Sequence, residues 1–278
     1  MKRNYTVALC QMDSRENREE NLHAACRLVE DAAGRGADLA AFPELFNVID
    51  RGETPPEDIP EGPSVSCMAL QAEKFGIWIL CGSLYSRDPH GGKMRNTSVL
   101  LTPEGTIAAQ YDKIHLFDVT LPDGSTAFES ERVQPGEKMV VADTELGKLG
   151  MSICYDLRFP EQYRWMALSG AQVFLIPAEF NLGTGKLHWE TLLRTRAIEN
   201  GCYVIAPAQI GTKQTKDGPF PCYGSSMVVD PNGVVIARAP ERTGITLANI
   251  DLDYEDQVRR NIPVLKNRRT DLYTLNGL

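Results

Sequence analysis

Several features that would point to common classes of protein are missing from this sequence. The 278 residues carry a formal net charge of -8, whereas nonspecific binding to nucleic acid needs a basic face. No segment approaches the length needed to span a bilayer. The basic start is followed by an apolar run that is too short for a signal peptide and lacks a small-residue cleavage site. We therefore expect neither nucleic acid nor a membrane as a partner.

The cysteines do not follow the spacing of a disulfide framework or of a structural zinc site. There are seven of them, an odd number, and no C-x-x-C pair occurs. Most lie among apolar neighbours, as small core residues do, and this usage fits a reducing cytoplasm best. Paired histidine ligands, a P-loop and a dinucleotide fingerprint are also missing, so we expect neither a metal nor an organic cofactor.

The apolar pattern predicts strand–helix units mixed with hairpins. No linker rich in proline and serine divides the chain, so residues 1–278 are expected to form one domain. An α/β layered fold, with a mixed sheet system covered by helices, accounts for this order. Helices are predicted at residues 14–33, 64–75, 160–169, 187–200 and 254–261. Strands are predicted at residues 5–10, 39–42, 77–84, 97–102, 106–111, 139–142, 148–153, 173–176, 202–206, 225–229, 234–238 and 246–250.

Cys154 is the most informative residue. It ends the apolar run 148–153, and a polar turn and a helix start follow it. A thiol placed there can lie beside backbone N–H groups, which would lower its pKa and favour the nucleophilic thiolate. The backbone N–H of Tyr155, the next residue, could then hold an oxyanion. Taken alone, a cysteine at a strand end is more often a packed apolar residue.

Two charged residues end apolar strands of their own. Glu44 follows residues 39–42, and Lys113 follows residues 106–111. Hydrolysis of an amide needs a nucleophile, a base and a group that holds the developing oxyanion. Glu44 suits the base if burial raises its pKa, and Lys113 supplies a fixed positive charge. Each also has an ordinary interpretation, as a helix cap or a surface charge, and only the fold could bring them to Cys154.

Three short stretches closely resemble the nitrilase superfamily of carbon–nitrogen hydrolases. The family's F-P-E, K-x-H-L-F and C-Y-D-x-R-F-P-E motifs are met, in the family's order, at residues 42–44, 113–117 and 154–161. The likeness extends over nearly the whole chain. It implies a four-layer α-β-β-α sandwich that assembles into homodimers or larger homo-oligomers. The polar segment 266–278 is then expected to be a C-terminal tail that docks on a partner subunit.

The resemblance also implies which residues carry the chemistry. Its catalytic triad corresponds to Glu44, Lys113 and Cys154. Members of the family often have a second glutamate in the loop after the lysine motif, and Glu129 in the sequence F-E-S matches it. Glu129 would orient Lys113 or the substrate. The ordinary alternative is a solvated loop carboxylate.

Within the superfamily, the chain is most similar to the ω-amidase and deaminated-glutathione amidase branches. Both branches cleave the side-chain amide of small keto-dicarboxylate compounds. The matching stretches are residues 180–185, 188–199 and 268–273, so Phe180 and Asn181 become candidates for substrate binding. Glu179 stands where those relatives usually carry a small residue. If Glu179 faces the pocket as a carboxylate, it would repel an anionic substrate.

A carboxylated substrate needs a cation and a cradle of donors. Arg158 lies four residues past the nucleophile, and a guanidinium fork suits a carboxylate, although Arg158 could equally pair with Asp156 or Glu161. The hydroxyl of Thr184 and nearby backbone N–H groups, in a glycine-flanked turn before a helix, could complete the cradle. A loop at 51–63 is either a substrate cover or an ordinary surface excursion, and the loop at 213–221 could also reach the pocket.

These residues predict a cytoplasmic amidase that hydrolyses the terminal amide of a small carboxylated substrate to acid and ammonia through a cysteine thioester. Hydrolysis of N-carbamoyl amides or nitriles would use the same triad. A papain-like enzyme would instead use His115 or His188 as the base, but the Gly/Ser/Trp context of its cysteine is absent. A non-enzymatic redox sensor or scaffold is the alternative from a different class.

Overall fold

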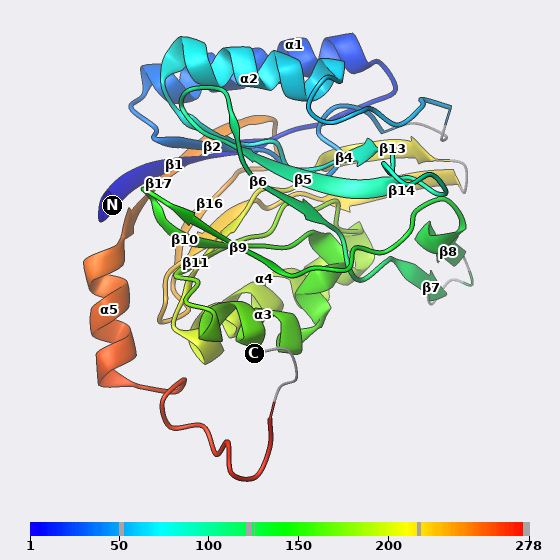
Figure 1. The fold of residues 1–278 in the computed structure, drawn as a ribbon. Coiled ribbons are helices and arrows are strands. Elements are labelled where there is room, and N and C mark those ends of the chain that lie inside the picture. Colours follow the sequence, from blue (N-terminus) through cyan, green and yellow to red (C-terminus); the bar gives the residue numbers. More distant parts are fainter. Residues whose placement is uncertain (50–52, 121–123, 125, 216–217, 275–278) are drawn as a thin grey trace.

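The computed structural model describes residues 1–49, 53–120, 124, 126–215 and 218–274. Three regions singled out in the sequence therefore fall partly outside the described residues, at positions 51–52, 216–217 and 275–278. Figure 1 shows two sheets packed face to face between two pairs of helices. This arrangement is the α-β-β-α sandwich that the resemblance implied, and it confirms the α/β class. None of the helices in the described ranges has the length and apolar character needed to cross a membrane.

The first sheet has seven strands in the order β17-β1-β2-β3-β5-β4, with β6 paired to β5. Its central strands β1, β2 and β3 are parallel, and its other pairings are antiparallel. The helices α1 (Arg18–Gly34) and α2 (Pro63–Phe75) cover its outer face (Figure 1). The strands are β1 (Asn4–Gln11), β2 (Leu39–Ala41), β3 (Trp78–Leu80), β4 (Leu84–Ser86), β5 (Arg95–Leu101), β6 (Ile107–Asp112) and β17 (Gly244–Asp251).

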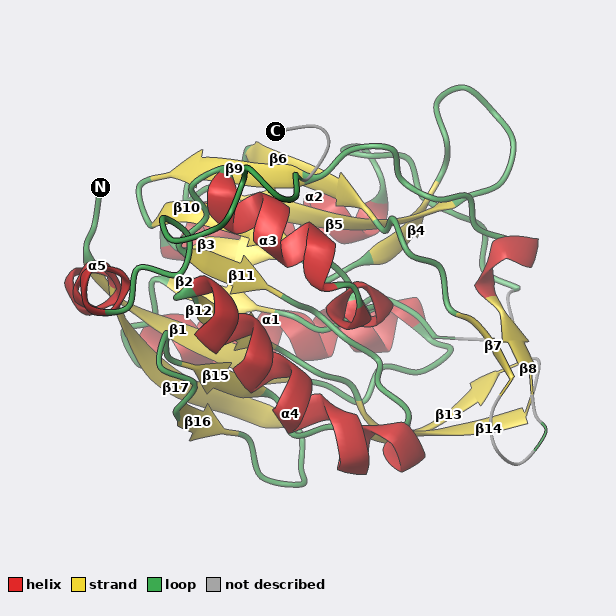
Figure 2. Cartoon of the chain, turned by 90° about the horizontal axis from the view of Figure 1, so that it is seen from below, coloured by secondary structure: helices red, strands yellow, loops and turns green. Residues whose placement is uncertain are grey.

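The second sheet has six strands in the order β16-β15-β12-β11-β10-β9. Here β10, β11 and β12 are the parallel strands. The helices α3 (Pro160–Leu168) and α4 (Leu182–Asn200) cover its outer face, and α5 (Leu252–Asn261) lies beside the sheets (Figures 1 and 2). The strands are β9 (Val140–Thr144), β10 (Gly147–Met151), β11 (Val173–Leu175), β12 (Tyr203–Ala206), β15 (Met227–Val229) and β16 (Val235–Arg238).

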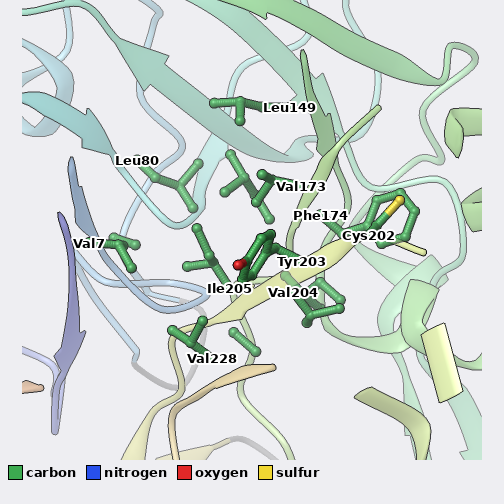
Figure 3. Close-up of a cluster of buried hydrophobic side chains, with 14 of the residues drawn as sticks. Val7, Leu80, Leu149, Val173, Phe174, Cys202, Tyr203, Val204, Ile205 and Val228 are labelled. Atoms are coloured by element: carbon green, nitrogen blue, oxygen red, sulfur yellow. The ribbon is translucent and has the colours of Figure 1, made fainter. Parts of the chain in front are cut away.

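The core between the two sheets consists of side chains that alternate along the strands. Val7 and Leu80 of the first sheet face Val173 of the second, and all three are fully buried (Figure 3). Phe174, the next residue of β11, points to the opposite face, where its ring packs edge-on against Tyr163 of α3 at 5.1 Å. Because the parallel strands are buried on both faces, they appear in the sequence as continuous apolar runs.

Helix caps account for the largest differences from the predicted helix boundaries. The side chain of Asn17 accepts a hydrogen bond from the backbone N–H of Glu20, so α1 begins at residue 18 rather than 14. The side chain of Asn181 does the same for the N–H of Gly183 at 2.8 Å. The helix α4 therefore begins at residue 182, five residues before the predicted start. In both helices the first turn has few apolar residues, so the apolar pattern of the sequence did not mark where the helix begins.

The predicted strand at 77–84 is two strands, β3 and β4, separated by a turn at Gly82. Its φ is +48°, a left-handed conformation that L side chains rarely adopt. A Cβ atom at this position would lie 1.9 Å from the carbonyl oxygen of Pro43. The turn therefore packs directly against the backbone that precedes Glu44, and only a glycine allows this approach.

We expect Gly82→Ala to destabilise the protein by at least ~3 kcal/mol, because it adds a backbone clash to the strain of a positive φ. Gly76→Ala is the matched control. Gly76 ends α2 with a φ of +63°, but a Cβ atom there meets nothing within 4 Å, so only the strain of ~1 kcal/mol applies. Urea denaturation measures both values. Equal losses in the two variants would show that the contact with Pro43 has no role.

Candidate active site

The three residues of the predicted triad converge at one end of the sandwich. Glu44 follows β2, Lys113 follows β6, and Cys154 follows β10 and begins the short 3-10 helix η2 (Cys154–Arg158). Carboxyl ends of parallel strands such as β2 and β10 commonly form binding crevices. All three residues line a single cavity of about 750 Å³. The fold thus places together three residues that are far apart in the sequence.

Lys113 is the centre of a buried cluster of charges. Its Nζ atom lies 2.9 Å from Oε1 of Glu44 and 2.9 Å from Oε2 of Glu129. Only 2% of the surface of Lys113 is exposed. Burial by itself would lower the pKa of Lys113, but the two carboxylates outweigh it and raise the pKa well above its usual value. The ammonium group is therefore a permanent positive charge beside the thiol.

A buried asparagine connects the two glutamates. Asn96, on β5, donates from Nδ2 to Oε1 of Glu44 at 3.0 Å and to Oε1 of Glu129 at 3.1 Å. The backbone carbonyl oxygen of Asn96 accepts a hydrogen bond from the backbone N–H of Lys113 at 2.9 Å. Asn96 was not among the residues singled out in the sequence, because the predicted strand begins at the next position. A polar amide next to a run of buried strand residues was the available signal.

Cys154 has a φ of +47°, which is rare for a residue other than glycine. Its backbone N–H donates to the carbonyl oxygen of Pro177 at 2.9 Å, which holds this conformation. The thiol is buried, and its pKa is shifted in the direction opposite to the one expected from the sequence. Burial, and then the carboxylate of Glu44, raise the pKa of Cys154 well above its usual value, and Lys113 offsets only part of this. The sulfur therefore carries its proton at rest, and a base must remove it.

Glu44 is placed to be that base. Its Oε1 accepts from Lys113, and its Oε2 accepts from the backbone N–H of Glu179 at 2.9 Å. The carbonyl oxygen of Glu44 accepts from Nε2 of Gln209 at 3.0 Å. These contacts hold both the backbone and the carboxylate, so the group that interacts with the Cys154 thiol has one orientation.

The buried carboxylate of Asp156 joins the lysine motif to the cysteine motif. It accepts from the hydroxyl of Tyr111 at 2.7 Å, from the backbone N–H of Ile153 at 2.8 Å and from the backbone N–H of His115 at 3.0 Å. Nδ1 of His115 lies 2.8 Å from the same carboxylate, and the His115 ring stacks on Phe159. Asp156 therefore positions two segments that come from different sheets.

Neither histidine of the papain-like alternative interacts with the nucleophile in the part of the chain that the structure describes. His115 is held by Asp156, and Nδ1 of His188 lies 3.1 Å from Nη1 of Arg158. Besides burial, the carboxylate of Glu44 and the ammonium of Lys113 affect the pKa of Cys154 most. This arrangement favours a glutamate base over a histidine base.

Arg158 lies in the cavity wall without a carboxylate partner among the described residues. Its guanidinium carbon is 4.9 Å from the ring centre of Phe180 and 5.8 Å from that of Tyr155. It forms no ion pair with Asp156, whose oxygens are occupied, or with Glu161. Burial lowers the pKa of Arg158, as expected for a partly desolvated cation. Among the described residues, Arg158 therefore does not pair with either of the acids that the sequence offered as partners.

The remaining candidates also line the cavity, with one change of setting. Phe180, Asn181 and Tyr155 are in the wall, and Tyr155 lies in the first turn of η2. Thr184 lies in the first turn of α4 rather than in a turn before it. The side-chain oxygen of Asn181 is occupied as the cap of α4, which explains this earlier start. Glu179 also lines the cavity, so an acidic side chain is present there besides those of Glu44 and Glu129.

Two hairpins that the sequence did not predict form the rim. They are β7 (Asp118–Thr120) with β8 (Thr126–Phe128), and β13 (Ile210–Thr215) with β14 (Gly218–Tyr223). Figures 1 and 2 show them side by side at the same end of the molecule. Phe128 and Phe220 from these hairpins line the cavity. Residues 53–63, the described part of the loop at 51–63, do not line the cavity. This part of the loop is therefore a separate surface segment and does not cover the cavity.

The described ranges contain no group of three or more His, Cys, Asp or Glu side chains placed to hold a metal ion. In the cavity, a thiol, a carboxylate and a permanent ammonium group lie next to one another, and a guanidinium lies in the cavity wall. Such a set can form and break a thioester.

Several known proteins are similar to this chain over most of its length. The sequence model described as carbon-nitrogen hydrolase matches residues 6–260. The chain is 42% identical over 272 residues to deaminated glutathione amidase from Synechocystis, covering 95% of this chain and 98% of that protein. It is 37% identical over 277 residues to omega-amidase NIT2 from Danio rerio, covering 99% of this chain and 98% of that protein.

A third relative is a larger protein, the nitrilase and fragile histidine triad fusion protein NitFhit of Caenorhabditis elegans. The chain is 42% identical to it over 277 residues, which cover 97% of this chain but only 62% of the fusion protein. The crystal structure of NitFhit superposes with a TM-score of 0.86 and 39% identity, covering 98% of this chain and 66% of that one.

Proposed function

This chain belongs to the carbon-nitrogen hydrolase family, and we propose that it hydrolyses the terminal amide of a small carboxylated substrate to acid and ammonia. One observation carries the proposal. The ammonium of Lys113 lies between the carboxylates of Glu44 and Glu129, next to the thiol of Cys154, in the same cavity as the guanidinium of Arg158, which has no carboxylate partner among the described residues. The thiol, the two carboxylates and the ammonium can together perform acyl transfer. The guanidinium can bind an anionic end of the substrate.

In the proposed reaction, Glu44 removes the proton from Cys154 as the sulfur attacks the amide carbon. The tetrahedral oxyanion is held by Lys113 and the backbone N–H of Tyr155, and one such donor contributes ~3 kcal/mol to the stability of the transition state. Glu44 returns the proton to the departing nitrogen, so ammonia leaves and a thioester remains. Water activated by Glu44 then hydrolyses the thioester to the free acid.

The names of the relatives support a substrate of the ω-amidase or deaminated-glutathione amidase type. In this proposal the substrate carboxylate binds Arg158, while Phe180, Asn181 and Thr184 shape the pocket around the acyl chain. Ammonia release from a panel of ω-amides, N-carbamoyl amides and nitriles tests it, scored by kcat/KM. Release of carbon dioxide together with ammonia would favour carbamoyl hydrolysis, and the absence of ammonia with every compound would favour a non-enzymatic role.

We expect Arg158→Met to raise KM for a carboxylated amide ~10- to 100-fold, because a charge-assisted hydrogen bond is lost. Hydrolysis of a neutral amide of similar length should change less than ~3-fold. Arg87→Met is the control, since the exposed guanidinium of Arg87 pairs with Asp58 outside the cavity. Steady-state kinetics with both amides provide the comparison. Equal effects of Arg158→Met on the charged and the neutral substrate would rule out a carboxylate site.

We also propose a cytoplasmic homo-oligomer in which the segment 266–278 docks on a partner subunit. The seven cysteines are all free, which suits a reducing compartment. Figure 1 shows the chain after α5 running outside the layered body. Leu272 and Tyr273 on this segment and Ile198 on α4 are largely exposed apolar side chains, and a second subunit would cover such surface. Sedimentation equilibrium measures the stoichiometry.

A further inference from the structure

Two cysteines of the outer helices lie in contact with each other, away from the cavity. Cys26 is on α1 and Cys67 is on α2, the two helices that pack side by side over the first sheet (Figure 1). Their sulfur atoms are 3.5 Å apart, although the residues are 41 positions apart in the sequence. Neither cysteine lines the cavity, so the proposed hydrolysis does not account for this pair.

The pair is more accessible than the other cysteines. Cys26 and Cys67 are partly exposed, whereas the other five cysteines are buried. Figure 1 shows α1 and α2 on the side of the molecule opposite the segment that follows α5. An assembly that forms through that segment would therefore leave the two sulfur atoms open to small solutes.

The contact between the sulfur atoms favours ionisation of one member of the pair. With Cys26 as the donor of the hydrogen bond, the pKa of Cys67 is lowered and the pKa of Cys26 is raised. The ammonium of Lys74, on α2, adds a positive charge near the pair. A partly exposed thiolate beside a second thiol is the arrangement typical of redox-sensitive cysteines.

A disulfide between these two residues requires only a small movement. The sulfur atoms would have to approach each other by about 1.5 Å to reach bonding distance. Each cysteine side chain has one rotatable bond that moves its sulfur atom, so small rotations can close the gap. The helices can therefore keep their positions on the sheet while the bond forms.

We infer that Cys26 and Cys67 are an oxidisable dithiol, whose disulfide links α1 to α2 after reaction with a hydroperoxide. The thiolate of Cys67 attacks the terminal oxygen of the hydroperoxide. The O–O bond breaks, the alcohol leaves with a proton from solvent, and Cys67 becomes a sulfenic acid. The sulfur of Cys26 then attacks the sulfenic sulfur, and the hydroxyl group leaves with the Cys26 proton as water. An external dithiol returns two electrons and two protons and restores both thiols.

The disulfide would stabilise the part of the fold that carries the proposed base. Glu44 lies between the two cysteines in the sequence, so the bond closes the chain around it. Such a closure restricts the unfolded chain more than the folded one, in which the two sulfur atoms already touch. The oxidised protein should therefore unfold at a higher temperature than the reduced protein.

Hydrogen peroxide is the probe for a direct test. The full chain is reduced, freed of reductant and treated with one molar equivalent of hydrogen peroxide. The count of free thiols should fall by two from seven, and mass spectra of a digest should show peptides joined through Cys26 and Cys67. The Tm should rise by about 5 °C. Dithiothreitol should reverse all three changes.

Variants separate the contact of the two sulfur atoms from exposure alone. Cys26→Ala keeps the thiol that reacts first, so the reaction should stop at a sulfenic acid on Cys67 that dimedone labels, with no rise in Tm. The matched control is the double variant Cys67→Ala with Ser66→Cys. It keeps the number of thiols but moves one of them to the neighbouring, exposed position of α2, and it should form no bond to Cys26.

The contrary outcomes are distinct, and none of them depends on the amide substrate. Seven unchanged thiols, a bond at another pair of cysteines, or a bond between two chains would overturn the inference. An equal yield of bonded product in the double variant would also overturn it, because exposure rather than the sulfur contact would then govern the reaction. A disulfide between Cys26 and Cys67 that leaves the Tm unchanged would contradict its stabilising role.

Discussion

Replacing Cys154 by alanine is expected to lower kcat at least ~10,000-fold, because it removes the group that forms the covalent intermediate. The backbone should be unaffected, since alanine keeps the Cβ atom and meets the same strain at a φ of +47°. Removing a buried, protonated thiol also leaves Glu44 and Lys113 paired. Ammonia release measures the loss, and calorimetry should still detect binding of the carboxylated substrate.

A second cysteine variant controls for general effects of thiol removal. Cys67 is on the outer helix α2 and does not line the cavity. We therefore expect the kcat of the Cys67→Ala variant to stay within ~2-fold of the wild type. Retention of more than about 1% of the activity in Cys154→Ala would exclude the thioester route. A non-enzymatic role for Cys154 would leave ammonia release absent in the wild-type protein as well.

Lys113→Met is the second change with a large expected effect, because it removes a charge that serves both catalysis and folding. Loss of the ammonium group should lower kcat ~1,000-fold, the upper value for one oxyanion group. It also leaves the buried carboxylate of Glu44 and the partly buried carboxylate of Glu129 without their cation, which we expect to cost ~3 kcal/mol of stability. Kinetics and urea denaturation of the same preparation measure the two effects.

The double variant Lys113→Met with Glu129→Gln separates these effects. Neutralising Glu129 removes the repulsion between two buried acids, so part of the lost stability should return. The activity should not return, because the oxyanion still lacks its cation. Recovery of activity together with stability would show that Lys113 acts only as a structural counter-ion.

The sequence was informative where chemistry depends on residues next to one another. The motifs at 42–44, 113–117 and 154–161 identified the three groups that the fold brings to one cavity. Asn96 was missed because its role depends on contacts with two glutamates that lie far away in the chain. The direction of the Cys154 pKa shift was wrong for the same reason, since burial and the proximity of Glu44 are consequences of tertiary structure.

The hairpins at the rim escaped prediction for another physical reason. Residues 218–223 include three positions occupied by glycine or proline, and the strand pattern is not regularly apolar. Pairing of β13 with β14 along six residue pairs, from Ile210 with Tyr223 to Thr215 with Gly218, specifies this hairpin. Contacts between strands outweigh their weak individual preference for extended structure.

The protonated state of Cys154 has a consequence beyond hydrolysis. Peroxides and alkylating agents react with thiolates and scarcely with thiols. In the resting protein the same burial and the same Glu44 charge that hold the proton on the sulfur should therefore spare it from oxidation. Reactivity then arises only when a bound amide accepts the sulfur as the proton moves to Glu44, so this nucleophile is protected until its substrate arrives.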